Sequence, residues 1–116
     1  MAAEQGHARA QFNLGIRYDD GEGVLEDDKE AAKWYRLAAE QGHANAQSNL
    51  AFRYANGEGV LEDAIAADAW LNIAGANGHE AASKATDDIQ LSQSGIEQAQ
   101  ALSREWVEKI PALLGD

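Results

Sequence analysis

The sequence has 116 residues, of which 45% are hydrophobic and 25% charged, and its formal net charge is −11. A chain of this length builds one domain, and its apolar content excludes an acidic disordered tail. The negative charge disfavours nucleic acids and membrane surfaces as partners and favours a protein or peptide, a basic one above all. The sequence contains no cysteine, which excludes disulfides and thiolate chemistry.

Targeting signals are also missing from the sequence as given. No basic segment is followed by an apolar run, and no stretch approaches the roughly 20 apolar residues of a membrane-spanning helix. We therefore expect a cytoplasmic protein. A signal peptide that has already been removed is the alternative that stays open.

A 36-residue period organises the chain. Residues 2–37 and 38–73 agree at 22 of 36 positions when one block is shifted onto the other. A third, more divergent copy keeps glycine, histidine and tryptophan in step, as Gly6, Gly42 and Gly78, His7, His43 and His79, and Trp34, Trp70 and Trp106. This period predicts a single domain over residues 1–116, with repeats at about 2–37, 38–73 and 74–109.

Each repeat is expected to form two helices. The first spans about 8–19, where small or apolar residues recur every four positions, and Gly21 suits its C-terminal cap. Asp27 is the predicted N-cap of a second helix over about 27–40, with Glu30 completing a capping box, and Asp63 caps the equivalent helix. The following pairs are expected at 44–55 and 63–76, then at 80–90 and 92–109. Trp34 and Trp70 are expected to be largely buried within their repeats.

The spacing A-x3-LG-x2-Y-x2-G-x-GV, followed by D and then A-x2-WY-x2-AAEQGHA-x-AQ, resembles the Sel1-like repeat, a relative of the tetratricopeptide repeat. The second copy departs from that pattern at Ala51 and Leu71. The resemblance implies an all-α fold, a right-handed α-α superhelix (solenoid) in which the last of three repeats serves as C-terminal cap. It also implies an adaptor that assembles other proteins. The matching residues of the first copy are Ala10, Leu14, Gly15, Tyr18, Gly21, Gly23, Val24, Asp27, Ala31, Trp34, Tyr35, Ala38 and Ala39.

Differences between the two good copies point to a binding surface. The positions that differ in the first helices form one helical stripe, and the resemblance to tetratricopeptide repeats implies that this stripe lines a concave groove. Phe12, Ile16 and Phe52 would supply its apolar contacts, although Phe12 and Ile16 packing against the next repeat is the alternative. Two polar pairs that do not differ, Asn13/Asn49 and Arg17/Arg53, either face the ligand or make structural hydrogen bonds. The predicted partner-binding residues are Arg9, Phe12, Asn13, Ile16, Arg17, Asp19, Asn45, Ser48, Asn49, Phe52, Arg53, Asn56 and Lys84.

Catalytic, metal and cofactor sites find no support in the sequence. Histidines one repeat apart are separated by about 10 Å of helix packing, too far to share one metal ion, and are interpreted as turn residues. The acidic turn 19–23 lacks a carboxylate at the first position of a calcium loop, and no nucleophilic triad or phosphate loop is present. We expect no enzyme activity, no metal and no cofactor.

The leading hypothesis is a protein-binding or peptide-binding adaptor that uses its concave face. One alternative is a structural fragment of a longer repeat array, and another, implied by a few relatives, is a weak hydrolase. Because the array begins within a repeat, at Met1–Gln5, we also expect weak self-association through the N-terminal edge.

Overall fold

The structure, a computed structural model, describes residues 7–21, 27–85, 89 and 91–115. In these ranges it contains six α-helices, one 3-10 turn and no strand, so the predicted all-α class is confirmed. Five helices begin and end within one residue of their expected limits. The exception is α5, expected to reach residue 90, which ends at Ala85, and most of the residues after it lie outside the described ranges. The elements are α1 (Ala8–Asp20), α2 (Asp28–Ala39), α3 (Ala44–Asn56), α4 (Ala64–Ala76), α5 (Glu80–Ala85), α6 (Gln93–Lys109) and η3 (Pro111–Leu113).

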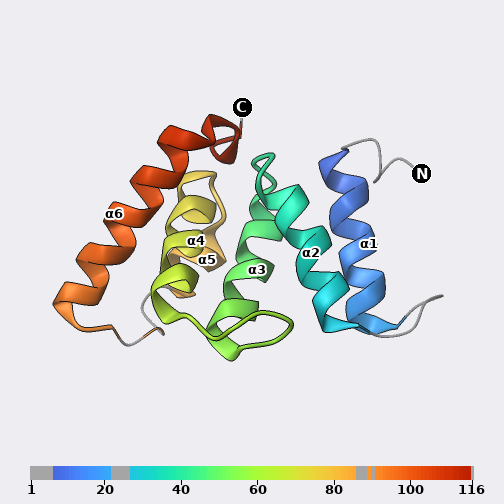
Figure 1. Ribbon diagram of the computed structural model, residues 1–116. Helices are drawn as coiled ribbons and strands as arrows, with labels where there is room; N and C mark the ends of the chain where they lie inside the picture. Colours follow the sequence, from blue (N-terminus) through green and yellow to red (C-terminus); the bar gives the residue numbers. More distant parts are fainter. Residues whose placement is uncertain (1–6, 22–26, 86–88, 90, 116) are drawn as a thin grey trace.

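The helices stack side by side as an α-α superhelix (Figure 1). α1 pairs with α2 and α3 pairs with α4, while α2 joins the two pairs by packing on α3. The third repeat is reduced to the short α5 and the long α6, both of which pack on α4. α6 therefore closes the array at the C-terminal side, as expected for a terminal capping element.

The helix ends follow the chemistry of their capping residues. Gly21 and Gly57 end α1 and α3 with φ of 72° and 69°, a left-handed conformation that costs glycine little. Asp27 Oδ1 accepts hydrogen bonds from the backbone N–H groups of Lys29 (3.0 Å) and Glu30 (3.1 Å). Asp63 does the same for Ala66 at 3.0 Å, so both predicted aspartate caps are confirmed.

Two of the repeated histidines are helix caps. His43 Nδ1 accepts from the backbone N–H of Ala46 at 3.1 Å, and His79 Nδ1 accepts from Ala82 at 3.0 Å. Burial lowers the pKa of His43, which keeps the ring neutral and Nδ1 free to accept. The histidines were expected to be turn residues, and these two act as N-caps of the helices that follow, α3 and α5.

The core lies between the helix pairs and consists largely of alanine, which lets the helices approach closely. The largest side chains that are fully buried in it belong to Tyr35, Leu50, Leu71, Leu113 and Gln47. Trp70 is only 3% exposed, as predicted, and its ring lies 5.1 Å from that of Trp106 on α6.

Trp34 is less buried than Trp70. Trp34 is only partly buried, and the Lys33 ammonium lies 5.3 Å from the centre of its ring. The position of the two rings in the array explains the difference, because α6 covers Trp70 on α4. The residues that follow the two tryptophans, Tyr35 and Leu71, have no exposed surface in either repeat.

Two further expectations concern membranes and the N-terminal edge. Within the described part of the chain, no helix is long and apolar enough to cross a membrane. Met1–Gln5, on which the expected self-association depends, lies outside the described residues. That self-association stays a prediction.

Candidate functional site

Four of the predicted binding residues meet in one pocket of about 210 Å³. Asp19 contributes from the end of α1, and Asn49, Phe52 and Arg53 contribute from α3. Glu58, in the turn after α3, completes the lining. We call this hollow the Phe52 pocket.

Arg53 forms the anchored wall of the Phe52 pocket. It is 7% exposed, and its guanidinium makes ion pairs with Asp19 and, at 3.2 Å, with Asp28 Oδ1 at the start of α2. Burial works to lower the pKa of Arg53, but the hydrogen bond and the charge of Asp19 outweigh it and raise that pKa. The guanidinium is therefore a fixed cation that ties α3 to the first repeat.

Tyr35 supports the same wall from the core. Its hydroxyl donates to Asp19 Oδ2 at 3.1 Å, and its ring centre lies 5.8 Å from Arg53 Cζ. Burial, followed by the charge of Asp19, raises the pKa of Tyr35 to about 12. The hydroxyl stays a donor at neutral pH, so the carboxylate of Asp19 is held from two sides.

Arg17 and Arg53 hold the same position in the two copies but have different surroundings. Arg53 is buried, which supports the structural interpretation for this copy, whereas Arg17 on α1 is exposed. Arg53 takes its carboxylate from the preceding repeat, where Asp19 stands in the place that Ala55 occupies in the second repeat. Sequence identity between the copies therefore hides a difference in environment.

Phe52 is the exposed apolar group of the pocket. Its side chain is 45% exposed although it lies on a helix that packs on both α2 and α4. An exposed aromatic ring beside ordered charged groups is typical of a protein contact.

The rest of the stripe does not share this exposure. Phe12 is partly buried, and its ring lies 4.6 Å from His43 and 5.7 Å from Tyr35. Ile16 is partly buried against the core, and Ser48 is only 3% exposed. The expectation that Ser48 faces solvent was wrong, because α3 lies between α2 and α4 and less of its surface stays open.

The remaining predicted residues are exposed but do not line the pocket. Arg9, Asn13 and Arg17 are exposed on α1, Asn45 and Asn56 at the two ends of α3, and Lys84 on α5. The sequence comparison missed Glu58, because it considered only the first helices and Glu58 lies in the turn after α3, where both copies carry the same Gly-Glu-Gly sequence.

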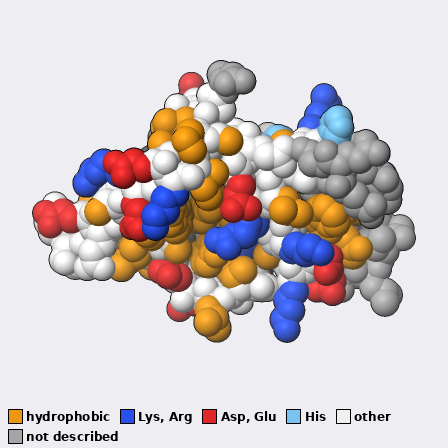
Figure 2. Space-filling view, turned by 45° about the horizontal axis from the view of Figure 1, so that its top comes forward, with side chains coloured by type: hydrophobic (Ala, Val, Ile, Leu, Met, Phe, Trp, Pro, Cys, Tyr) orange, Lys and Arg blue, Asp and Glu red, His pale blue; other side chains and the backbone are white. Residues whose placement is uncertain are grey.

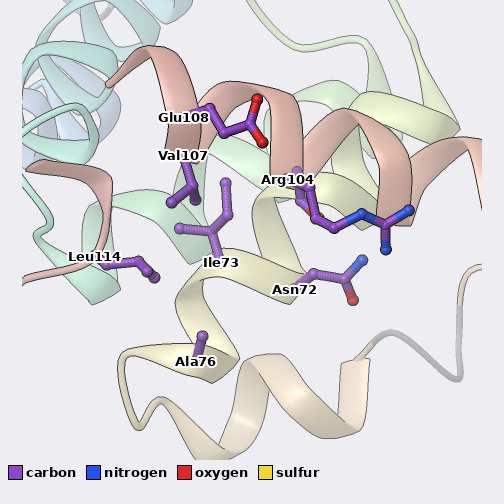
Figure 3. Close-up of a pocket in the computed structure, with 8 residues that line it drawn as sticks. Asn72, Ile73, Ala76, Arg104, Val107, Glu108 and Leu114 are labelled. Atoms are coloured by element: carbon purple, nitrogen blue, oxygen red, sulfur yellow. The ribbon is translucent and has the colours of Figure 1, made fainter. Parts of the chain in front are cut away.

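A second hollow, of about 380 Å³, lies between α4 and α6. Figure 3 shows Ile73 and Val107 facing each other across it, with Arg104 and Glu108 on α6. Leu114, 43% exposed, borders it from the C-terminal segment. The face shown in Figure 2 carries hydrophobic side chains among groups of both charge signs. Among the described residues, no group of three or more potential ligands could hold a metal ion.

The Sel1 repeat pattern matches residues 8–43 and 44–79, which hold the helix pairs α1–α2 and α3–α4. The chain belongs to the Sel1 repeat family. The matched units have the 36-residue length of the sequence period. They begin at Ala8 and Ala44, the first residues of α1 and α3, which is six residues after the boundaries expected from the sequence. Sel1 repeats generally serve as protein–protein interaction modules, on a scaffold that is typically non-catalytic.

Solved Sel1-type structures resemble this chain closely. One is a protective antigen present in uropathogenic Escherichia coli strains that displays an SLR fold, 37% identical with a TM-score of 0.90 over 97% of this chain. Another is a Sel1 repeat protein from Oxalobacter formigenes, 38% identical with a TM-score of 0.75 over 77% of this chain. The chain spans only 25% and 26% of the length of these two proteins. No curated protein matches it.

Proposed function

We propose that this Sel1 repeat protein is an adaptor that binds a partner protein or peptide on the concave face formed by α1 and α3, with Phe52 at the centre of the contact. The observation that carries the proposal is the 45% exposure of Phe52 in a pocket whose charged wall is already in place. A ligand that meets an ordered wall loses less free energy to side-chain ordering than one that must organise the site.

The size and charge of the pocket indicate the kind of contact. At about 210 Å³ it is smaller than the roughly 300–1,000 Å³ of typical small-molecule pockets, which suits one inserted side chain. Asp19, Asp28 and Glu58 surround the single cation Arg53, and the whole chain carries a net charge of −11. This balance favours a basic partner segment.

A second function is supported by one specific observation. Because the chain spans about a quarter of each solved relative, the same two repeats can serve as one segment of a longer concave surface. In that case Phe52 contributes to an interface that further repeats complete.

The test compares two exposed apolar residues. Leu61, which is 90% exposed in the turn before α4, lies outside the Phe52 pocket and provides the control. Partner capture by the intact chain should fall about 30-fold in Phe52→Ser, since a hot-spot side chain contributes about 2 kcal/mol or more. Capture should be unchanged in Leu61→Ser. Equal capture by all three proteins would contradict the proposal.

A further inference from the structure

The segment that follows α6, residues 111–115, is bound through its backbone by the side-chain amides of Gln47 and Asn77. Gln47 Nε2 and Asn77 Nδ2 both donate to the main-chain carbonyl of Leu113, each at 2.8 Å. The backbone N–H of Gly115 donates in turn to Asn77 Oδ1 at 2.9 Å. Figure 1 shows the C-terminal end lying beside the α2–α3 turn. We call Gly42, Gln47 and Asn77 the tail seam.

The repeats themselves orient both amides. Asn77 Nδ2 donates to Gln47 Oε1 at 2.9 Å, and Gln47 Nε2 donates to the carbonyl of Ala39 at 3.0 Å. Gln47 has no exposed surface. Donors that are fixed in this way bind a chain segment through its main-chain carbonyl, whichever side chains that segment carries.

The backbone of residues 112–115 approaches Gly42 so closely that no side chain fits at position 42. A Cβ on Gly42, whose φ is +88°, would lie 2.6 Å from the carbonyl oxygen of Ala112 and 2.8 Å from Gly115 Cα. On the occupant's side, a Cβ on Gly115 would lie 3.1 Å from the carbonyl oxygen of Gly42, so the fit is also tight at that position, while the Leu113 side chain is fully buried. A hollow of about 270 Å³, lined by Gly42, Ala44, Ala76, Asn77 and Gly115, adjoins the segment and leaves room for a longer or larger occupant.

The first repeat has the same bond between side-chain amides, with Gln11 in the place of Gln47. Gln41 stands where the second repeat has Asn77, and it donates both to Gln11 Oε1 and back to the carbonyl of Leu37 on its own helix. Asparagine is one methylene shorter, and Asn77 directs its amide to Leu113 in a different part of the chain. The change from glutamine to asparagine thus coincides with capture of an external carbonyl.

We propose that the tail seam is a second peptide-binding site, which residues 111–115 fill in cis and which an uncharged, leucine-centred segment of a partner protein fills in exchange, in the same 3-10 turn. The proposal does not depend on the Phe52 pocket. Residues 111–115 are joined to α6 through Ile110 alone, so they can leave the tail seam without unfolding α6. A partner segment that also fills the adjoining hollow makes contacts that the native segment lacks.

The experiment uses the full chain with Leu113→Asp, which weakens docking of its own segment and leaves the tail seam unchanged. The probe is an acetylated, amidated peptide with the sequence of residues 110–115, titrated while the side-chain amide signals of Gln47 and Asn77 are followed by NMR. Saturable shifts are expected in Leu113→Asp at lower peptide concentrations than in the wild-type chain, whose own segment competes at high effective concentration. No saturable shift, or equal affinity for both proteins, would overturn the proposal.

Matched variants exclude binding elsewhere. Adding Asn77→Gln should weaken peptide binding about 5- to 100-fold, because the bonds of Asn77 to Leu113 and to Gly115 are both disturbed. Adding Gln41→Asn should leave peptide binding unchanged. If Leu113→Asp lowers the helical signal, the peptide should restore it, and failure to do so counts against the tail seam. Association of the variant with wild-type chains in sedimentation would assign the seam to a second copy and overturn the partner assignment.

Discussion

At the scale of single residues, the stripe on the first helices divides into packing and binding positions. Phe12 on α1 contacts Tyr35 and His43, whereas Phe52 is 45% exposed in its pocket. Phe52 is also more exposed than Ile16, which holds the equivalent position in the first repeat. The two phenylalanines therefore separate stability from binding.

We predict that substituting Phe12 lowers the stability of the fold much more than substituting Phe52. Phe12→Ser should lower the free energy of unfolding by about 2–4 kcal/mol, because it removes a partly buried ring from contact with two others. Phe52→Ser should change it by less than about 0.5 kcal/mol, as most surface substitutions do. Thermal unfolding followed by circular dichroism measures both, and a large loss in Phe52→Ser would assign that ring to the core.

A buried carboxylate gives a pH-dependent prediction. Asp68 is 5% exposed on α4, where the first repeat has Ala32, and burial raises its pKa above the ordinary value of 3.8. The fold therefore favours the neutral acid, so this stabilising effect is complete below pH 3.8 and is lost as the pH rises through the folded-state pKa.

Removing that charge should stabilise the protein at neutral pH. Asp68→Asn, which keeps the shape of the side chain, and Asp68→Ala, which copies the first repeat, should both raise the melting temperature at pH 7. The gain should shrink as the pH approaches 4, because the native acid is then neutral as well. Melting curves at several pH values measure this, and a gain independent of pH would show that burial of the charge is not the cause.

At the scale of the elements, the helices could be predicted from sequence because their signals are local. Asp27, Asp63 and Gly21 lie at the helix ends that their chemistry favours, and the 36-residue period supplies the remaining limits. The burial of Trp34 could not be predicted in this way, because it depends on the helix that covers each tryptophan. The capture of Leu113 by Gln47 and Asn77 likewise joins residues far apart in sequence.

The second helices should respond unequally to loss of their tryptophans. Trp70→Ala should cost about 3–5 kcal/mol, because it empties a site between α4 and α6. Trp34→Ala should cost clearly less, about 1–2 kcal/mol, since the side chain is only partly buried. Denaturant unfolding of both variants provides the comparison, and equal losses would contradict the environments described for the two rings.

At the scale of the whole molecule, the array places its functional surfaces on different parts of the fold. α3 carries the Phe52 pocket on its exposed side and Gln47 of the tail seam on its buried side. The candidate site was only partly visible in the sequence, since the stripe included Phe52 and Asp19 but also the buried Ser48, and it left out Glu58. Exposure is a property of the packed array, and comparing two copies cannot supply it.

The most direct test of binding through the Phe52 pocket is side-chain footprinting of the intact chain with and without its captured partner. Phe52, Leu61 and Ile96 are all exposed large apolar side chains, so each reacts with hydroxyl radicals in the free protein. We predict that the partner protects Phe52 strongly and leaves Leu61 and Ile96 as reactive as before. Unchanged oxidation of Phe52, with protection confined to the other two residues, would contradict binding at this face.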